Sequence, residues 1–111
     1  MGYVFVAKTS EIAPGTGRLF EIEKHKVALF NLDGEFYAID DLCTHEEASL
    51  SSGVVKDEAI ECPKHGALFS IKTGAVLAMP AVVPVGTYAV MVEDDQVLID
   101  LSSESTKQVH K

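Results

Sequence analysis

The sequence has 111 residues, 47% of them hydrophobic, which suffices for one domain with a modest core. Its formal net charge of −8 argues against nucleic acid and an anionic membrane surface as partners, because both attract lysine and arginine. No apolar run approaches the roughly 18 residues of a membrane span, and the first residues lack the basic region of a signal peptide. The negative charge suits either electrostatic steering of this protein towards a basic patch on a partner protein or simply its solubility in water.

Alternating apolar residues predict four strands in the first forty residues, at 3–7, 18–23, 27–32 and 35–39. Asp33-Gly34 between the last two apolar runs predicts a tight hairpin. Residues 9–17 are rich in turn formers and predict a loop. His25 lies between two lysines and is interpreted as a solvent-facing turn residue.

The stretch from residue 43 to residue 71 holds both cysteines, and each is closely followed by a histidine. The pairs are Cys43-x-His45 and Cys62-x-x-His65. A single pair would be explained by a buried cysteine and a surface histidine. Since both cysteines and two of the four histidines follow this pattern, among turn-forming residues, we predict a four-ligand metal site. Two sulfur and two nitrogen ligands suit either iron–sulfur or zinc chemistry.

Shorter strands are predicted around this motif, at 54–55, 59–61, 67–71 and 75–77. A proline-bracketed loop follows at 79–86, and a closing hairpin is predicted from strands at 88–93 and 96–101. The fold class is therefore all-β: a small antiparallel sandwich or barrel, with an inserted subdomain that carries the metal site. We expect a base formed by residues 1–40 and 80–101, an inserted subdomain at about 41–79, and a frayed tail at 102–111 that contains His110.

The ligand spacing and the residues around it resemble the Rieske family, and in particular the ferredoxins of bacterial ring-hydroxylating dioxygenases. Zinc sites more often pair like with like, as C-x2-4-C and H-x3-5-H. The matching positions beyond the ligands are Ala48, Ser49, Leu50, Gly53, Gly66, Phe69, Thr73, Gly74, Pro80, Ala81, Pro84 and Tyr88. One departure is Ser70, where that group usually has aspartate.

The resemblance implies one [2Fe-2S] cluster, with Cys43 and Cys62 on one iron and His45 and His65 on the other. It also implies a one-electron carrier between an NAD(P)H-dependent flavin reductase and a Rieske non-haem-iron terminal dioxygenase. We expect no catalytic site, because only His25 and His110 remain and the chain has no room for a mononuclear iron domain. With both cysteines on a metal, no disulfide remains, and we expect a monomer in the cytoplasm.

Two alternatives stay open at this point. The chain could be the Rieske-type small subunit of a nitrite reductase, or a structural zinc-binding interaction domain. In the high-potential Rieske proteins, a serine and a tyrosine after the second histidine donate hydrogen bonds to sulfur. The matching residues here are Ala67 and Phe69, which cannot donate, so we expect a reduction potential near the low end of the Rieske range.

Overall fold

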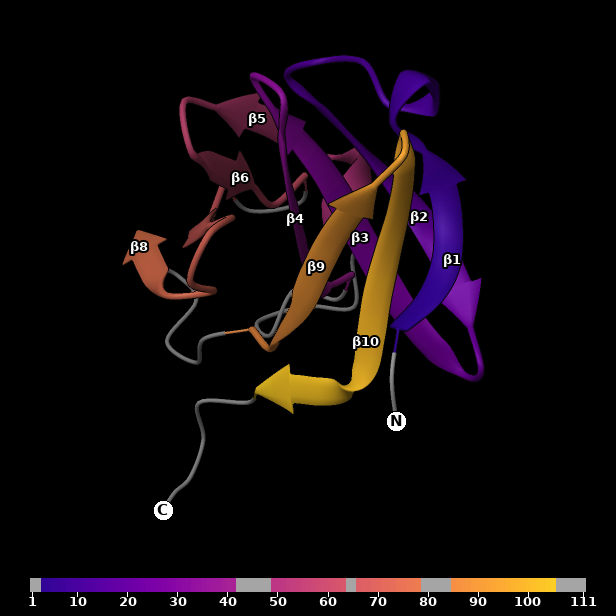
Figure 1. The fold of residues 1–111 in the computed structure, drawn as a ribbon. Helices are drawn as coiled ribbons and strands as arrows, with labels where there is room; N and C mark the ends of the chain where they lie inside the picture. The colour runs from indigo at the N-terminus through magenta and orange to yellow at the C-terminus, as the bar shows by residue number, and fades with distance from the viewer. Residues whose placement is uncertain (1–2, 42–48, 64–65, 79–84, 106–111) are drawn as a thin grey trace.

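The structure is a computed structural model that describes residues 3–41, 49–63, 66–78 and 85–105 (Figure 1). Within these ranges the chain forms ten strands and two short 3-10 helices. The prediction of an all-β fold is confirmed. No helix in the described ranges is long and apolar enough to span a membrane.

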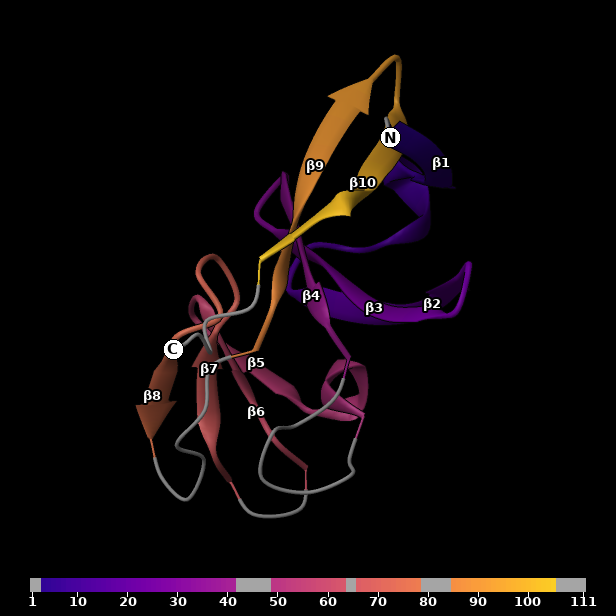
Figure 2. The same cartoon turned by 90° about the horizontal axis from the view of Figure 1, so that it is seen from below.

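The strands form two antiparallel sheets, which Figure 2 shows one below the other. The larger has six strands in the order β1-β10-β9-β4-β3-β2. Its bounds are β1 (Tyr3–Lys8), β2 (Thr16–Ile22), β3 (His25–Leu32), β4 (Glu35–Asp40), β9 (Thr87–Glu93) and β10 (Gln96–Ser105). The smaller has four strands in chain order: β5 (Val54–Lys56), β6 (Ala59–Glu61), β7 (Leu68–Ser70) and β8 (Val76–Ala78). Each predicted strand is found, and the smaller sheet follows β4 and precedes β9 in the chain.

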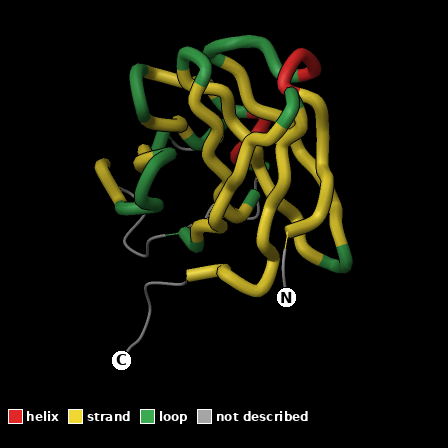
Figure 3. Tube along the Cα trace, viewed as in Figure 1, coloured by secondary structure: helices red, strands yellow, loops and turns green. Residues whose placement is uncertain are grey.

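The two helices, red in Figure 3, each make a single turn. Helix η1 (Thr9–Glu11) lies in the segment that was expected to be a loop. Helix η2 (Leu50–Ser52) packs against β2, β3 and β6 and buries Leu50 completely. It therefore connects both sheets just before the smaller one begins.

Strand β3 is buried on both faces. Val27 and Leu29 pack with residues of β1, β9 and β10 inside the larger sheet. Ala28 and Phe30 face the other way and pack with Ile60 and other residues of the smaller sheet. The uninterrupted apolar run of β3 is explained by this position between two cores, since neither face meets water.

The pairing of β2 with β3 depends on a close contact. Gly17 lies opposite Phe30 in the register, and a Cβ on Gly17 would lie 2.3 Å from the Phe30 ring. Only glycine leaves the space that this ring fills.

The β3–β4 turn has the predicted hairpin geometry. Asp33 and Gly34 both have positive φ, 56° and 96°, as a two-residue turn of this kind requires. The buried side chain of Asn31 braces it, because its Oδ1 accepts from the Gly34 N–H at 2.7 Å. Its Nδ2 donates to the Ile12 carbonyl oxygen at 2.8 Å.

Two expectations from the sequence are wrong. The turn before β3 consists of Glu23 and Lys24, both with positive φ, so His25 is the first strand residue and not a solvent-facing turn residue. Its half-buried ring packs edge-on against Tyr88, with Nδ1 3.2 Å from the Tyr88 hydroxyl. Strand β10 also continues beyond 101 to Ser105, which pairs with Thr87.

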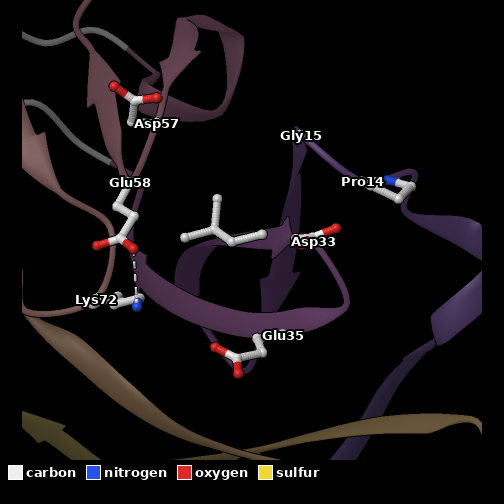
Figure 4. A pocket seen from close by; sticks show the side chains of 8 residues that line it. Pro14, Gly15, Asp33, Glu35, Asp57, Glu58 and Lys72 are labelled. Carbon is white, nitrogen blue, oxygen red and sulfur yellow. Dashed lines mark ion pairs between the residues drawn. The ribbon is translucent and has the colours of Figure 1, made fainter.

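A polar bridge joins the two sheets at the β3–β4 turn. Lys72, after β7, forms an ion pair with Glu58 at 3.2 Å (Figure 4), and its Nζ lies 5.6 Å from the centre of the Tyr37 ring on β4. The Tyr37 hydroxyl donates to Glu35 at 2.8 Å. The hydrogen bond with Glu58 raises the pKa of Lys72 above its ordinary value of 10.5.

We expect this bridge to lose its effect at alkaline pH. Because the folded-state pKa of Lys72 is raised, its contribution to stability is complete below its ordinary pKa of 10.5 and is lost as the pH rises through the folded pKa. The gap in Tm between wild type and Lys72→Gln should be constant from neutral pH to about pH 10 and then narrow. Thermal unfolding followed by circular dichroism measures this, with Lys8→Gln as a control for the lost charge. A gap that stays constant at strongly alkaline pH would contradict the prediction.

Candidate metal centre

Of the four predicted ligands, the structure describes Cys62, while Cys43, His45 and His65 lie outside the described residues. The four-ligand site therefore stays a prediction. Within the described ranges, no three histidine, cysteine, aspartate or glutamate side chains come together as a metal site. The geometry that bears on the site is that of Cys62 and of the residues that flank the other ligands.

Cys62 follows β6 directly and carries a free thiol that is only 1% exposed. Its backbone N–H donates to the Ala67 carbonyl oxygen at 2.7 Å, and its own carbonyl oxygen accepts from the Gly66 N–H at 3.1 Å. Gly66 adopts a positive φ of 78°, which suits glycine. These bonds connect the two ends of a short segment, and in the sequence His65 falls between them.

The surroundings of Cys62 are apolar. Leu50, Ile60, Ala67 and Phe69 are all fully buried in the same cluster. A free thiol in such a place fits a thiolate ligand of a metal that is shielded from water on this side.

The segment with Cys43 and His45 is held at its ends by Asp41. This side chain is 3% exposed, and its Oδ1 accepts from the Ser51 backbone N–H at 2.6 Å. The Ser49 hydroxyl donates to the other carboxyl oxygen. Asp41 also donates its own backbone N–H to the Lys26 carbonyl oxygen at 2.9 Å, which fixes it to β3.

After this segment the chain packs tightly against the strand that leads to Cys62. A Cβ on Gly53 would lie 1.9 Å from the Glu61 carbonyl oxygen. Gly53 has a φ of −82°, which any residue adopts, so glycine is needed here for space and not for conformation. The chain that follows the first predicted ligand segment is thus in backbone contact with the residue before Cys62.

The third flanking segment, residues 79–84, returns to the fold at Val85. The Val85 N–H donates to the Gly74 carbonyl oxygen at 2.9 Å, and a Cβ on Gly74 would lie 2.2 Å from the Val85 carbonyl oxygen. Gly86 accepts from the Asp40 N–H at 2.9 Å. The expected proline loop itself lies outside the described residues.

The register places these departures at one end of the smaller sheet. Val54, Glu61, Leu68 and Ala78 form a single cross-strand row. Each of these four residues begins or ends a strand, and the segments that carry the predicted ligands and the proline loop come before or after these strand ends in the chain. Cys62 and the described residues that border the other predicted ligand segments therefore lie near this end of the smaller sheet.

A pocket of about 640 Å³ lies at the opposite end of the sheets (Figure 4). Asp33, Glu35, Asp57, Glu58 and Lys72 contribute to its lining. Since Glu35 begins β4 and Asp40 ends it, about 17–20 Å of strand separate this pocket from Asp41. We therefore do not assign the pocket to the metal centre.

Comparison with known proteins identifies the class of this site. The family model of the Rieske [2Fe-2S] domain matches residues 2–89. The chain belongs to this family, so an iron–sulfur cluster is its cofactor.

Within the Rieske family, the chain is most similar to ferredoxins of dioxygenases among the proteins compared below. The chain is 43% identical over 105 residues to the 3-phenylpropionate/cinnamic acid dioxygenase ferredoxin subunit of Photorhabdus laumondii, covering 94% of this chain and 99% of that protein. The ferredoxin of carbazole 1,9a-dioxygenase from Nocardioides aromaticivorans superposes with a TM-score of 0.85 at 37% identity, covering 89% of this chain and 97% of that one. A chain from the complex of reduced oxygenase and oxidised ferredoxin in carbazole 1,9a-dioxygenase has a TM-score of 0.84 at 33% identity, covering 97% of both.

A nitrite reductase subunit is less similar to this chain than the ferredoxins are. A chain named as the small subunit of an NADPH nitrite reductase has a TM-score of 0.80 at 28% identity, covering 89% of this chain and 98% of that one.

Sequence reasoning missed the roles of Asp41 and Gly53. In the sequence, Asp41 is only one of the turn-forming residues before Cys43, and Gly53 only one of the positions that match the Rieske family. Each acts on a partner eight or more residues away, Ser49 and Glu61 respectively. No local pattern signals such pairs.

We expect Gly53→Ala to lower the free energy of unfolding by about 1–3 kcal/mol, because the added methyl group would overlap the backbone at Glu61. Urea unfolding of the metal-free chain measures this. Gly15→Asn is the control, since a Cβ there meets no atom within 4 Å and asparagine tolerates a φ of 80°. Equal stability of the two variants would show that the contact at Gly53 is not tight.

Proposed function

We propose that Cys43, His45, Cys62 and His65 hold one [2Fe-2S] cluster, and that the chain carries single electrons to a Rieske non-haem-iron terminal dioxygenase that acts on an aromatic substrate. The electron donor in this proposal is an NAD(P)H-dependent flavin reductase. We further propose that the chain works as a monomer in the cytoplasm. The observation that carries the proposal is the end-to-end match to dioxygenase ferredoxins, one of them from a complex with its oxygenase.

The chain is an electron-transfer component and not an enzyme in its own right. Its match to a ferredoxin subunit covers 94% of this chain and 99% of that protein.

The donor set fits this cofactor. Cys43 and Cys62 would bind one iron, and His45 and His65 the other, as in Rieske centres. When bound, the cluster supplies a one-electron couple whose potential is raised by histidine ligation. The apolar side chains packed in the cluster with Cys62 would shield the cofactor from water on that side. The backbone hydrogen bonds of Cys62 to Ala67 and Gly66 hold this ligand in place.

Iron content and spectroscopy test the proposal. Chain produced with ample iron and sulfide should be red-brown, contain about two irons per chain and give an electron paramagnetic resonance signal after anaerobic reduction. His45→Ala should abolish or alter this signal, whereas His110→Ala should leave it unchanged. A colourless chain that binds one zinc would instead indicate the structural zinc domain. Failure of the reduced chain to reduce a ring-hydroxylating oxygenase would favour the nitrite reductase subunit.

We expect a reduction potential near the low end of the Rieske range, about −150 mV. Ala67 and Phe69 are fully buried in the same cluster as Cys62, and their side chains have no group that could donate to sulfur. A hydrogen bond that favours the reduced state by about 0.5–1.5 kcal/mol corresponds to about 20–65 mV for one electron. Ala67→Ser and Phe69→Tyr should each raise the potential by about this amount.

Protein-film voltammetry near neutral pH measures the effect. Phe30→Tyr is the matched control, because Phe30 is equally buried but lies on β3 of the larger sheet. A clearly positive potential for wild type, or equal shifts for Phe69→Tyr and Phe30→Tyr, would contradict the prediction.

A further inference from the structure

We infer that Asp41 is the positioning residue of the first ligand loop: its buried carboxyl group clamps the two ends of the segment that carries Cys43 and His45. The inference rests on the proposed function, because it takes these two residues as ligands. We call Asp41, Ser49 and Ser51 the loop clamp.

The loop clamp is a short bridge between the two sides of the loop. Asp41 precedes the segment 42–48, and Ser49 and Ser51 follow it. One carboxyl oxygen of Asp41 accepts from the Ser51 backbone N–H at 2.6 Å, and the other accepts from the Ser49 hydroxyl. The two serine hydroxyls are also within 2.9 Å of each other. Both carboxyl oxygens are thus used across the loop ends.

Each side of the loop clamp is attached to the rest of the fold. On one side, the Asp41 N–H donates to Lys26 and the Asp40 N–H donates to Gly86. On the other side, Leu50 is fully buried beside Cys62. The loop clamp therefore fixes the first ligand loop relative to the second, and not only its own two ends.

Burial increases the free-energy cost of losing these hydrogen bonds. Asp41 and Asn31 are the buried polar side chains among the described residues, at 3% and 5% exposure. Loss of the Asp41 carboxyl group would leave the Ser51 N–H and the Ser49 hydroxyl without this acceptor. Residues that orient metal ligands in this way typically change metal affinity by about 10–100-fold when they are replaced.

Asn31 provides a matched control. It is as buried as Asp41, and it also bridges two segments with a pair of hydrogen bonds, to Ile12 and Gly34. It lies at the β3–β4 turn, at the far end of the strands from Asp41. A purely structural effect should therefore be similar in Asp41→Ala and Asn31→Ala.

The experiment compares the purified full chain with its cluster in wild type, Asp41→Ala, Asp41→Asn and Asn31→Ala. The rate of cluster loss to an iron chelator, followed by visible absorbance well below each Tm, should be about 10–100-fold higher in Asp41→Ala than in Asn31→Ala. Asp41→Asn should remain close to wild type, because the amide oxygen still accepts from Ser51 and the amide nitrogen can donate to Ser49. Equal rates for Asp41→Ala and Asn31→Ala, or a wild-type rate for Asp41→Ala, would overturn the inference.

A milder pair keeps the test decisive if Asp41→Ala does not fold. Ser49→Ala removes one of the two clamp bonds, and Ser52→Ala removes a bond of the Ser52 hydroxyl to the Ser49 carbonyl oxygen within the same helical turn. Cluster loss should be faster in Ser49→Ala than in Ser52→Ala. Equal rates would count against the loop clamp.

Amide hydrogen exchange separates this inference from the proposed function. In the metal-free chain, the Ser51 amide should exchange slowly in wild type and Asp41→Asn and rapidly in Asp41→Ala. Rapid exchange in wild type would overturn the loop clamp even if the chain binds iron. A wild-type chain that shows slow exchange but never binds iron would overturn the proposed function instead.

Discussion

The structure depends on a strand that belongs to two cores at once. Strand β3 packs Val27 and Leu29 into the larger sheet and Ala28 and Phe30 against the smaller one. Full burial of each large apolar side chain contributes about 1.5–3 kcal/mol, so this shared wall is a large part of what holds the sheets together. Since Cys62 belongs to the same cluster as Phe30, the thiol is fixed relative to the larger sheet and not only to its own turn.

The two ends of the molecule use different kinds of contact. At the end with the predicted ligands, backbones approach closely at Gly53, and hydrogen bonds of Asp41 and Cys62 hold the flanking segments. At the far end, Lys72 pairs with Glu58 within the smaller sheet and reaches the larger sheet over the Tyr37 ring. Close backbone contacts leave little freedom to move, which suits a site that must change charge without changing shape.

How far the sequence predicts this structure depends on the distance over which each feature is determined. The Asp33-Gly34 hairpin follows from neighbouring residues and was predictable, while the four-ligand set stays a prediction because only Cys62 is described. The position of His25 depends on Tyr88, 63 residues away, and the end of β10 depends on its pairing with Thr87. The role of Asp41 depends on Ser51, ten residues away across an irregular loop. None of these partners is visible in a local pattern, and the Rieske resemblance supplied the cofactor and the partners.

Because both faces of β3 are buried, burial alone does not determine its register with β2. In most strands, a slip of one residue would turn apolar side chains outwards, and water would oppose it. In β3, such a slip would only exchange Val27 and Leu29 with Ala28 and Phe30, so solvent gives no penalty. Shape must then distinguish the correct alignment: the Phe30 ring needs the gap that Gly17 leaves, and no other position on β2 is a glycine.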